Sequence, residues 1–426
     1  MLNPDGCFSS PQEPAEDAAN EKSALRRKSL PGATVPAVVA TMRVREQHIA
    51  VFGGSGSGKT VLVSSLYGAA QEQAFLKESL FHVIADDTGQ GHRLRQNYLG
   101  MKNNARAPEP TRFAATPYSF TLKSKNQGGA KAAKARPFDA LRFVWHDYPG
   151  EWFEEEPSSE EETKRRVDTF RSLLRSDVAL ILVDGQELLD HAGEEEKYLK
   201  SLLWGLRDGL LRLKDELLDD GEPLAEFPRI WITALSKADL HPGLDVHAFQ
   251  DLVIEKAAGD VASLHEVLKG LVQLPDALSM GEDFLLLSSA KFEPGKIEVA
   301  ERVGVDLLLP VASPLPLERL VQWAERFEIP RKWLDQLADN ADVLAAVLVG
   351  ANFFSALLSK VPKVGPLLSK VALPGLTVVV ELTISKIEEM NAEARASQDY
   401  LKATLTQFRL DLDRGVKGDL LAKSLK

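Results

Sequence analysis

Dense apolar runs recur along the middle of the chain. Those at His48–Phe52, Asp177–Gly185, Arg229–Ser236 and Asp283–Ser289 are rich in Val, Ile and Leu. Such runs are typical of strands buried on both faces of a parallel sheet. The last three are separated from one another by segments long enough for a helix. The pattern therefore predicts an α/β fold with helices flanking a mostly parallel sheet.

Two further strand candidates, Pro117–Ser124 and Phe138–Asp147, are joined by the polar linker KNQGGAKAAKARP. This linker holds no crossover helix, so the two strands should pair antiparallel. The sheet is thus expected to contain one antiparallel strand. A helix at Pro316–Phe327 is expected to close the domain, which we place at residues 45–330.

The flanking regions differ in composition. Residues 1–44 are rich in Pro, Ser, Ala and charged residues, which predicts a disordered N-terminal lead. Residues 331–426 are expected to form an α-helical C-terminal module. This region holds two apolar segments, Val343–Leu358 and Val371–Ile384, followed by a polar helix with Leu401, Leu405 and Phe408 on one face.

Two interpretations of the apolar pair at 343–384 are open. Both segments are shorter than the roughly 20 residues of a membrane-spanning helix, which favours a packed helical hairpin. Lys360, Lys363 and Lys370 around the turn suit an anionic surface, which keeps a membrane-inserting hairpin open. The first interpretation predicts a cytoplasmic protein, and the second a protein at the periphery of the inner membrane.

Charge and cysteine content narrow the class of protein. The net charge of −11 argues against a nucleic-acid partner, since general nucleic-acid binders carry a basic surplus. The single cysteine, Cys7, excludes an internal disulfide framework and favours a reducing compartment. The N-terminus shows no apolar run of signal-peptide length, which also indicates the cytoplasm.

The stretch VFGGSGSGKT, Val51 to Thr60, fits the phosphate-binding pattern G-x-x-x-x-G-K-[ST]. Its glycines allow backbone N–H groups to turn toward phosphate oxygens, and the following helix adds its positive N-terminus. Lys59 is expected to neutralise the β- and γ-phosphates, and the Thr60 hydroxyl to bind Mg²⁺. The residues predicted to bind the phosphates are Gly53, Ser55, Gly56, Ser57, Gly58, Lys59, Thr60 and Val61.

Three later motifs each follow an apolar strand, and each alone is a common turn. In D-Y-P-G, Asp147 can hold Mg²⁺ through water, and the Gly150 N–H can approach a γ-phosphate. In S-K-A-D, Asp239 can accept from two donors on one base edge, which selects guanine over adenine. In S-S-A-K, a backbone N–H can donate to the guanine O6. The base-site residues predicted from these last two motifs are Ser236, Lys237, Asp239, Ser289, Ala290 and Lys291.

Taken in order, these four motifs resemble those of Ras-like P-loop GTPases of the TRAFAC class. The longer string D-Y-P-G-E-W-F resembles YcjX-like bacterial P-loop proteins and the double-GTPase proteins of bacterial conflict systems. The resemblance implies a bacterial Mg²⁺-dependent GTPase that binds GTP and GDP and acts as a molecular switch. It assigns phosphates and metal to Lys59 and Thr60, the γ-phosphate switch to Asp147 and Gly150, and guanine to Lys237 and Asp239, with a backbone contact from Ala290.

Of two departures from the family pattern, one weakens the selection of guanine and the other predicts slow turnover. Ser236 stands where the family has an asparagine, which weakens the selection of guanine. Glu151 stands where many members carry a water-positioning glutamine; its carboxylate could polarise water but would repel the γ-phosphate. We therefore take Lys59, Gly150 and Glu151 as the catalytic set and expect a protein partner or activator to supply positive charge.

Several points stay open at this stage. The switch-one threonine that would join Thr60 and Asp147 at the metal is Thr111, Thr116 or Thr88, with Thr116 favoured. A nucleotide-binding scaffold without turnover, or an ATPase of the same fold, would also fit the motifs. The oligomeric state leaves no signal in the sequence.

Overall fold

The computed structural model describes residues 44–108, 117–125, 139–153, 158–218, 221–224, 227–326 and 384–424. The predicted N-terminal lead, the KNQGGAKAAKARP linker and the apolar pair at 343–384 lie almost wholly outside these residues. Among the described residues, no helix has both the length and the apolar character needed to cross a membrane.

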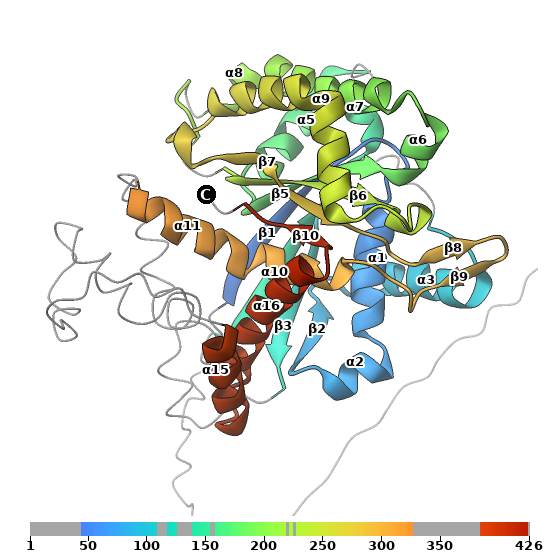
Figure 1. The fold of residues 1–426 in the computed structure, drawn as a ribbon, viewed down its shortest axis with the longest axis vertical. Coiled ribbons are helices and arrows are strands. Elements are labelled where there is room, and N and C mark those ends of the chain that lie inside the picture. Colours follow the sequence, from blue (N-terminus) through green and yellow to red (C-terminus); the bar gives the residue numbers. More distant parts are fainter. Residues whose placement is uncertain are drawn as a thin grey trace, which may run out of the picture. The chain divides into compact units, whose positions relative to one another are not determined.

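The centre of the fold is an eight-stranded sheet with the order β10-β7-β6-β5-β1-β4-β3-β2 (Figure 1). The strands from β7 to β4 in this order are parallel to one another, whereas β3 is antiparallel to β4 and to β2, and β10 is antiparallel to β7. The bounds are β1 (Val44–Phe52), β2 (Phe81–Ala85), β3 (Tyr118–Ser124), β4 (Ala140–His146), β5 (Val178–Asp184), β6 (Ile230–Ser236), β7 (Ser279–Leu286) and β10 (Leu421–Ala422). The predicted mostly parallel sheet is confirmed; β2 and β10 were not predicted, and β10 is a second antiparallel strand.

Helices cover both faces of this sheet (Figure 1). One face carries α1 (Lys59–Ala70), α2 (Gln73–Glu78), α3 (Thr88–Asn104), α10 (Leu308–Ala312), α11 (Pro314–Arg326), α15 (Ile384–Ala396) and α16 (Tyr400–Lys417). The other carries α5 (Glu160–Leu173), α6 (Gly185–Asp190), α7 (Glu195–Arg212), α8 (Lys214–Leu217) and α9 (Val246–Lys269). A small hairpin, β8 (Lys291–Glu293) and β9 (Lys296–Glu298), follows β7. The α/β class predicted from the apolar runs is therefore the observed one.

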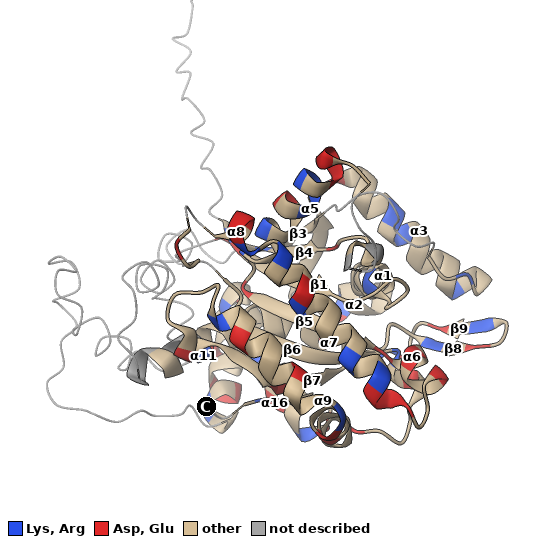
Figure 2. Ribbon diagram, turned by 90° about the horizontal axis from the view of Figure 1, so that it is seen from above, with Lys and Arg blue, Asp and Glu red and all other residues tan. Residues whose placement is uncertain are grey.

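Side-chain alternation along the strands creates the two cores. In β1, Ile49 and Val51 pack into the core on the α1 side, whereas Ala50 and Phe52 pack into the core on the α7 side. Charged residues lie on helices such as α7 and α9, whereas β5 and β6 between the layers carry almost none (Figure 2). The dense apolar runs in the sequence thus reflect strands that are buried on both faces.

The C-terminal part of the described chain packs against the same sheet. The helix predicted around Leu401, Leu405 and Phe408 is α16, and these three side chains are buried in the core on the α1 side. After α16, the chain adds β10 to the edge of the sheet, where Leu421 pairs with Leu285. The boundary placed near residue 330 stays a prediction, because the structure describes nothing between 326 and 384.

A buried ion pair ties α11 to β7. Arg319 Nη2 lies 2.5 Å from Asp283 Oδ1, and the two side chains have exposed fractions of 1% and 0%. Asp283 also accepts from the Ser279 hydroxyl at 2.8 Å and from the Ser424 N–H at 2.9 Å. The carboxylate is thus surrounded by donors from α11, from β7 and from the chain after β10.

Replacing Arg319 by Ala should destabilise the protein strongly, because Asp283 would remain as a buried charge without its cation. Loss of one partner of such a pair costs about 3–5 kcal/mol, measured as the free energy of unfolding in urea. The matched control is Arg414→Ala, which breaks a more exposed pair with Asp411 and should cost under about 1 kcal/mol. If both variants lost an equally small free energy of unfolding, the stabilising role of the Arg319–Asp283 ion pair would be contradicted.

Candidate functional site

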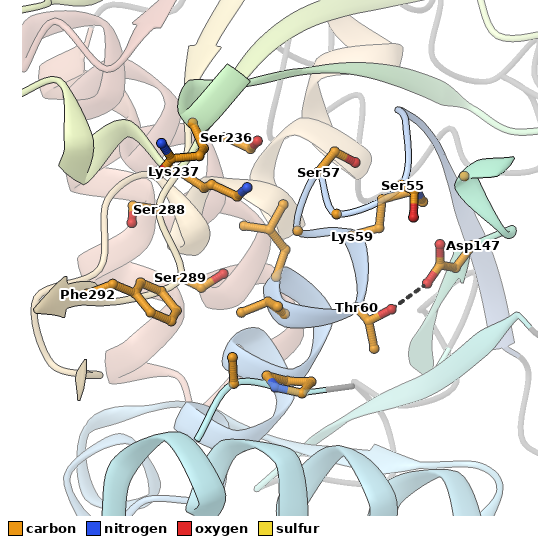
Figure 3. Close-up of a pocket in the computed structure, with 18 of the residues that line it drawn as sticks. Ser55, Ser57, Lys59, Thr60, Asp147, Ser236, Lys237, Ser288, Ser289 and Phe292 are labelled. Carbon is orange, nitrogen blue, oxygen red and sulfur yellow. Dashed lines mark hydrogen bonds between the residues drawn. The ribbon is translucent and has the colours of Figure 1, made fainter. Parts of the chain in front are cut away.

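The four sequence motifs meet at one edge of the sheet. Since β1, β4, β5, β6 and β7 are parallel, the loops that follow them emerge at the same edge. A cavity of about 380 Å³ lies there. Its lining includes the predicted residues Ser55, Gly56, Ser57, Gly58, Lys59, Thr60, Val61, Asp147, Gly150, Ser236, Lys237, Asp239 and Ser289, shown in part in Figure 3.

The loop between β1 and α1 is shaped to hold an anion. Gly56 and Gly58 have φ values of 76° and 89°, a left-handed conformation that glycine adopts without strain. Gly58 directly precedes α1, so the positive N-terminus of this helix faces the loop. Lys59 Nζ donates to the carbonyl oxygens of Gly53 at 2.8 Å and Gly54 at 3.0 Å, so its ammonium group lies inside the loop.

Asp147 lies where the metal is predicted. Its Oδ2 accepts from the Thr60 hydroxyl at 3.1 Å, and its Oδ1 accepts from the Tyr148 N–H at 2.9 Å. Burial raises the pKa of Asp147, and Lys59, Thr60 and the Tyr148 N–H offset this only in part. A buried carboxylate that lacks full compensation beside a hydroxyl is a donor set that suits Mg²⁺. Among the described residues, there is no group of three or more His, Cys, Asp or Glu side chains that could hold a metal ion.

His146, directly before Asp147, adds no charge to the site near neutral pH. Its ring is stacked on His48 with centroids 5.2 Å apart, and it accepts or donates a hydrogen bond of 3.2 Å with the Ser172 hydroxyl of α5. Burial lowers the pKa of His146 to about 4, with His48 adding to the effect. With His146 neutral, Lys59 is the cation that acts on Asp147.

Tyr148 and Gly150 place the D-Y-P-G segment against the loop between β1 and α1, called the phosphate loop below. Sequence reasoning did not predict the contact made by Tyr148. The Tyr148 hydroxyl accepts from the Gly53 N–H at 2.9 Å, and Lys59 Nζ lies 5.1 Å from the centroid of its ring. A Cβ at Gly150 would come within 2.2 Å of the Ser55 nitrogen, so only glycine fits there. The predicted switch segment is therefore in direct contact with the loop that would bind the phosphates.

The opposite end of the cavity holds Lys237 and Asp239. Lys237 Nζ forms an ion pair of 2.7 Å with Asp184 Oδ2 at the end of β5. The two carboxylate oxygens of Asp239 accept from the Ser288 hydroxyl at 2.5 Å and the Phe292 N–H at 3.1 Å. Both side chains are thus fixed in place by the protein itself.

Three predicted residues lie behind or beside the cavity lining. The Gly53 N–H donates a hydrogen bond to the Tyr148 hydroxyl, and its carbonyl accepts one from Lys59 Nζ. Ala290 is fully buried, and Lys291 is about half exposed with its Nζ 3.1 Å from Glu293 Oε1. Neither Ala290 nor Lys291 lines the cavity, and the backbone contact assigned to Ala290 stays a prediction.

The identity of the switch-one threonine and the catalytic role of Glu151 stay predictions. Thr111 and Thr116 lie outside the described residues, as does the side chain of Glu151. Thr88 begins α3 and does not line the cavity. From the segment after α3, Ala107 and Pro108 reach the lining.

Besides Tyr148, sequence reasoning assigned no role to the side chains of Asp184, Ser288 and Phe292. Asp184 could have been suspected, since it ends the apolar run DVALILVD at the same edge as the other motifs. Phe292 directly follows the S-S-A-K motif, but nothing local shows that an aromatic residue there faces the cavity.

A protein-family model described as Double-GTPase 2 matches residues 47–268, more than half of the chain. The chain belongs to the double-GTPase 2 family. The matched range contains the phosphate loop, the D-Y-P-G motif and the S-K-A-D motif. The resemblance to double-GTPase proteins stated from the motifs is confirmed.

Other comparisons add little to this assignment. Among curated proteins, none matches the sequence significantly. One similar solved structure is that of Methanosarcina barkeri Roco2 RocCORdC bound to GDP, at 11% identity and a TM-score of 0.25. The alignment covers 74% of this chain and 66% of that one.

The raised pKa of Asp147 predicts a pH dependence of Mg²⁺-assisted nucleotide binding. The metal needs the ionised carboxylate, which exists above the pKa and is lost as the pH falls through it. Since burial raises that pKa, the loss should begin above the ordinary range of aspartate near 4. Titration of a fluorescent nucleotide against pH, with Mg²⁺ and with EDTA, measures this effect.

Asp147→Asn is the control for this experiment, since it removes the titrating group and keeps the size of the side chain. Protonation of the nucleotide phosphates is common to both proteins, so the difference between their profiles isolates Asp147. Identical profiles with Mg²⁺ would refute a metal role for this carboxylate.

Proposed function

We propose that this double-GTPase protein binds GTP with Mg²⁺, hydrolyses it slowly and acts as a molecular switch. The observation that carries the proposal is one cavity lined by the phosphate loop, by Asp147 and by both Lys237 and Asp239. This arrangement offers a cation and backbone N–H groups at one end and a base-reading carboxylate at the other. A guanosine triphosphate has the matching groups in the same order.

Each residue has a distinct role in this proposal. Lys59, which donates to Gly53 and Gly54 here, would transfer its N–H donors to the β- and γ-phosphates. Thr60 and Asp147 would hold Mg²⁺, which supplies charge neutralisation at the phosphates. The Gly150 N–H would donate to the γ-phosphate, and Glu151 would orient the attacking water for in-line displacement.

Slow turnover is proposed from the charges along the cavity. Among the described lining residues, the cations are Lys59 and Lys237, and Lys237 is paired with Asp184. Lys59 and Mg²⁺ would then face a highly charged triphosphate with no further cation from this part of the chain. A partner or activator that brings a positive charge would raise the rate.

The close contact between Gly150 and Ser55 supports the switch role. A γ-phosphate next to the loop would meet the D-Y-P-G backbone, so Asp147–Phe153 and the segment around Thr116 are proposed to change with the nucleotide state. The output through residues 331–426, to a protein partner or to a membrane through 343–384, remains part of this proposal. So do a bacterial source and a cytoplasmic location.

A looser nucleotide selectivity is the second candidate. The hydroxyl of Ser236 donates to the Val183 carbonyl at 3.2 Å, so it is used within the sheet and not on the phosphate loop. If the hydrogen bonds from Asp239 alone did not select guanine over adenine, the protein would be an ATPase of the same fold.

Lys59→Ala should abolish turnover, because the loop would lose its cation at the phosphates. We expect a fall in kcat of at least about 100-fold, as for other electrostatic donors at a reacting group, measured as phosphate release from GTP. Lys200→Ala is the matched control, since Lys200 lies on the exposed face of α7 in a pair with Glu196. Wild-type turnover no higher than that of the Lys59 variant, with or without partners, would favour the nucleotide-binding scaffold.

Asp239→Ala should remove the discrimination between GTP and ATP. The carboxylate would accept two hydrogen bonds from guanine, so we expect GTP binding to weaken about 100-fold while ATP binding changes little. Competition between the two nucleotides on one fluorescent probe measures both affinities. Asp276→Ala, at the exposed turn before β7, is the control. Equal GTP and ATP affinities in the wild type would instead support the ATPase.

A further inference from the structure

The loop from Ser288 to Val303 forms a closed unit at the base end of the cavity. Its ends are joined by two backbone hydrogen bonds, from the Ser288 N–H to the Val303 carbonyl at 2.8 Å and back at 2.9 Å. Between them lies the β8–β9 hairpin, which turns at Gly295 with a φ of 74°. The hairpin is thus a short, braced element directly after the strand that ends at the site.

This unit is bonded to the base-reading carboxylate at two points. The Ser288 hydroxyl donates to Asp239 Oδ1 at 2.5 Å, and the Phe292 N–H donates to Asp239 Oδ2 at 3.1 Å. The position of Phe292 is therefore set relative to the group proposed to read the edge of the base. If the edge of a base were bound by Asp239, one face of that base would lie within reach of the Phe292 ring, because the Phe292 N–H donates to the same carboxylate.

The ring of Phe292 has support behind it and open space before it. It packs against a small cluster of Tyr98 and Met101 from α3, Ile297 from β9, and Ala69, Ala290 and Val299. It also lines the cavity. Figure 3 shows the ring at the same end of the cavity as Lys237, Ser288 and Ser289, away from Thr60 and Asp147.

We propose that Phe292 stacks on the nucleobase and that the β8–β9 hairpin is the element that holds it there. This inference rests on the proposed function and adds to it a contact that contributes affinity for the base. The Phe292 ring would cover one face of the base. The side chain of Lys237, which is fixed by its ion pair with Asp184, would cover another part of the base. Stacking on an aromatic ring favours any base and so adds affinity without selecting guanine; Asp239 does the selecting.

Phe292→Ala should weaken GDP binding by between about 5-fold and 150-fold, the range found for loss of one base–aromatic stack. ADP and IDP should weaken by the same factor, because the ring reads the face of the base and not its edge. Inorganic tripolyphosphate has no base, so its affinity should stay within about twofold of the wild type. Isothermal titration or competition against a fluorescent nucleotide measures all four ligands.

Two variants separate this role from a merely structural one. Phe292→Trp keeps a flat aromatic face and should retain GDP affinity, whereas Phe292→Leu keeps the apolar packing and should lose it. Unchanged tripolyphosphate binding in each variant shows that the phosphate loop is folded. A Leu variant that binds GDP as the wild type does would overturn the proposal.

Failure of the proposed function gives a different result. If the wild-type chain binds tripolyphosphate but neither GDP nor ADP, then both the nucleotide site and the stacking role are wrong. If GDP binds the wild type and Phe292→Ala equally well, while Asp239→Ala loses it, the guanine site stands and only the role of Phe292 is overturned.

Discussion

The parallel pairing of β1 with both β4 and β5 is the constraint on which the site depends. In this register, Ala50 lies opposite His146 and Phe52 lies opposite Ile181. The phosphate loop that follows β1 therefore begins next to the residue that follows β4, and the Thr60 hydroxyl meets Asp147. A slip of one residue would turn the alternating core side chains of β1 to the wrong faces, so burial on both sides keeps the register fixed.

Two buried carboxylates at this edge have different environments. Asp184 has a lysine partner, Lys237, at 2.7 Å, at the end of the cavity where the base is proposed to lie. Asp147 has the Lys59 ammonium group nearby, the Thr60 hydroxyl and a backbone N–H, and burial still raises its pKa. A divalent cation would therefore be stabilised most next to Asp147, whose charge is only partly compensated. The end with the Asp184–Lys237 ion pair is better suited to an uncharged base.

The strand β7 connects this edge to the C-terminal helices. Before the site, β7 carries Asp283, which is bonded to Arg319 of α11. On α11, Glu318 forms ion pairs with Arg409 of α16 and with Lys423 after β10. Two helices that are far apart in sequence are therefore fixed to the strand that ends just before Ser288, through side-chain charges that are mostly buried.

Local sequence patterns were enough to predict the class of fold, the central strands, the phosphate loop and the position of α16, because apolar periodicity and glycine content act over a few residues. They did not reveal β10, a two-residue strand that exists because β7 offers an unpaired edge. Nor did they reveal that Tyr148 bonds to Gly53, or that Phe292 faces the cavity beside Asp239. Those contacts join residues from different loops. Which loops meet is decided by the order of the strands in the sheet, and strand order is a property of tertiary packing that no short stretch of sequence contains.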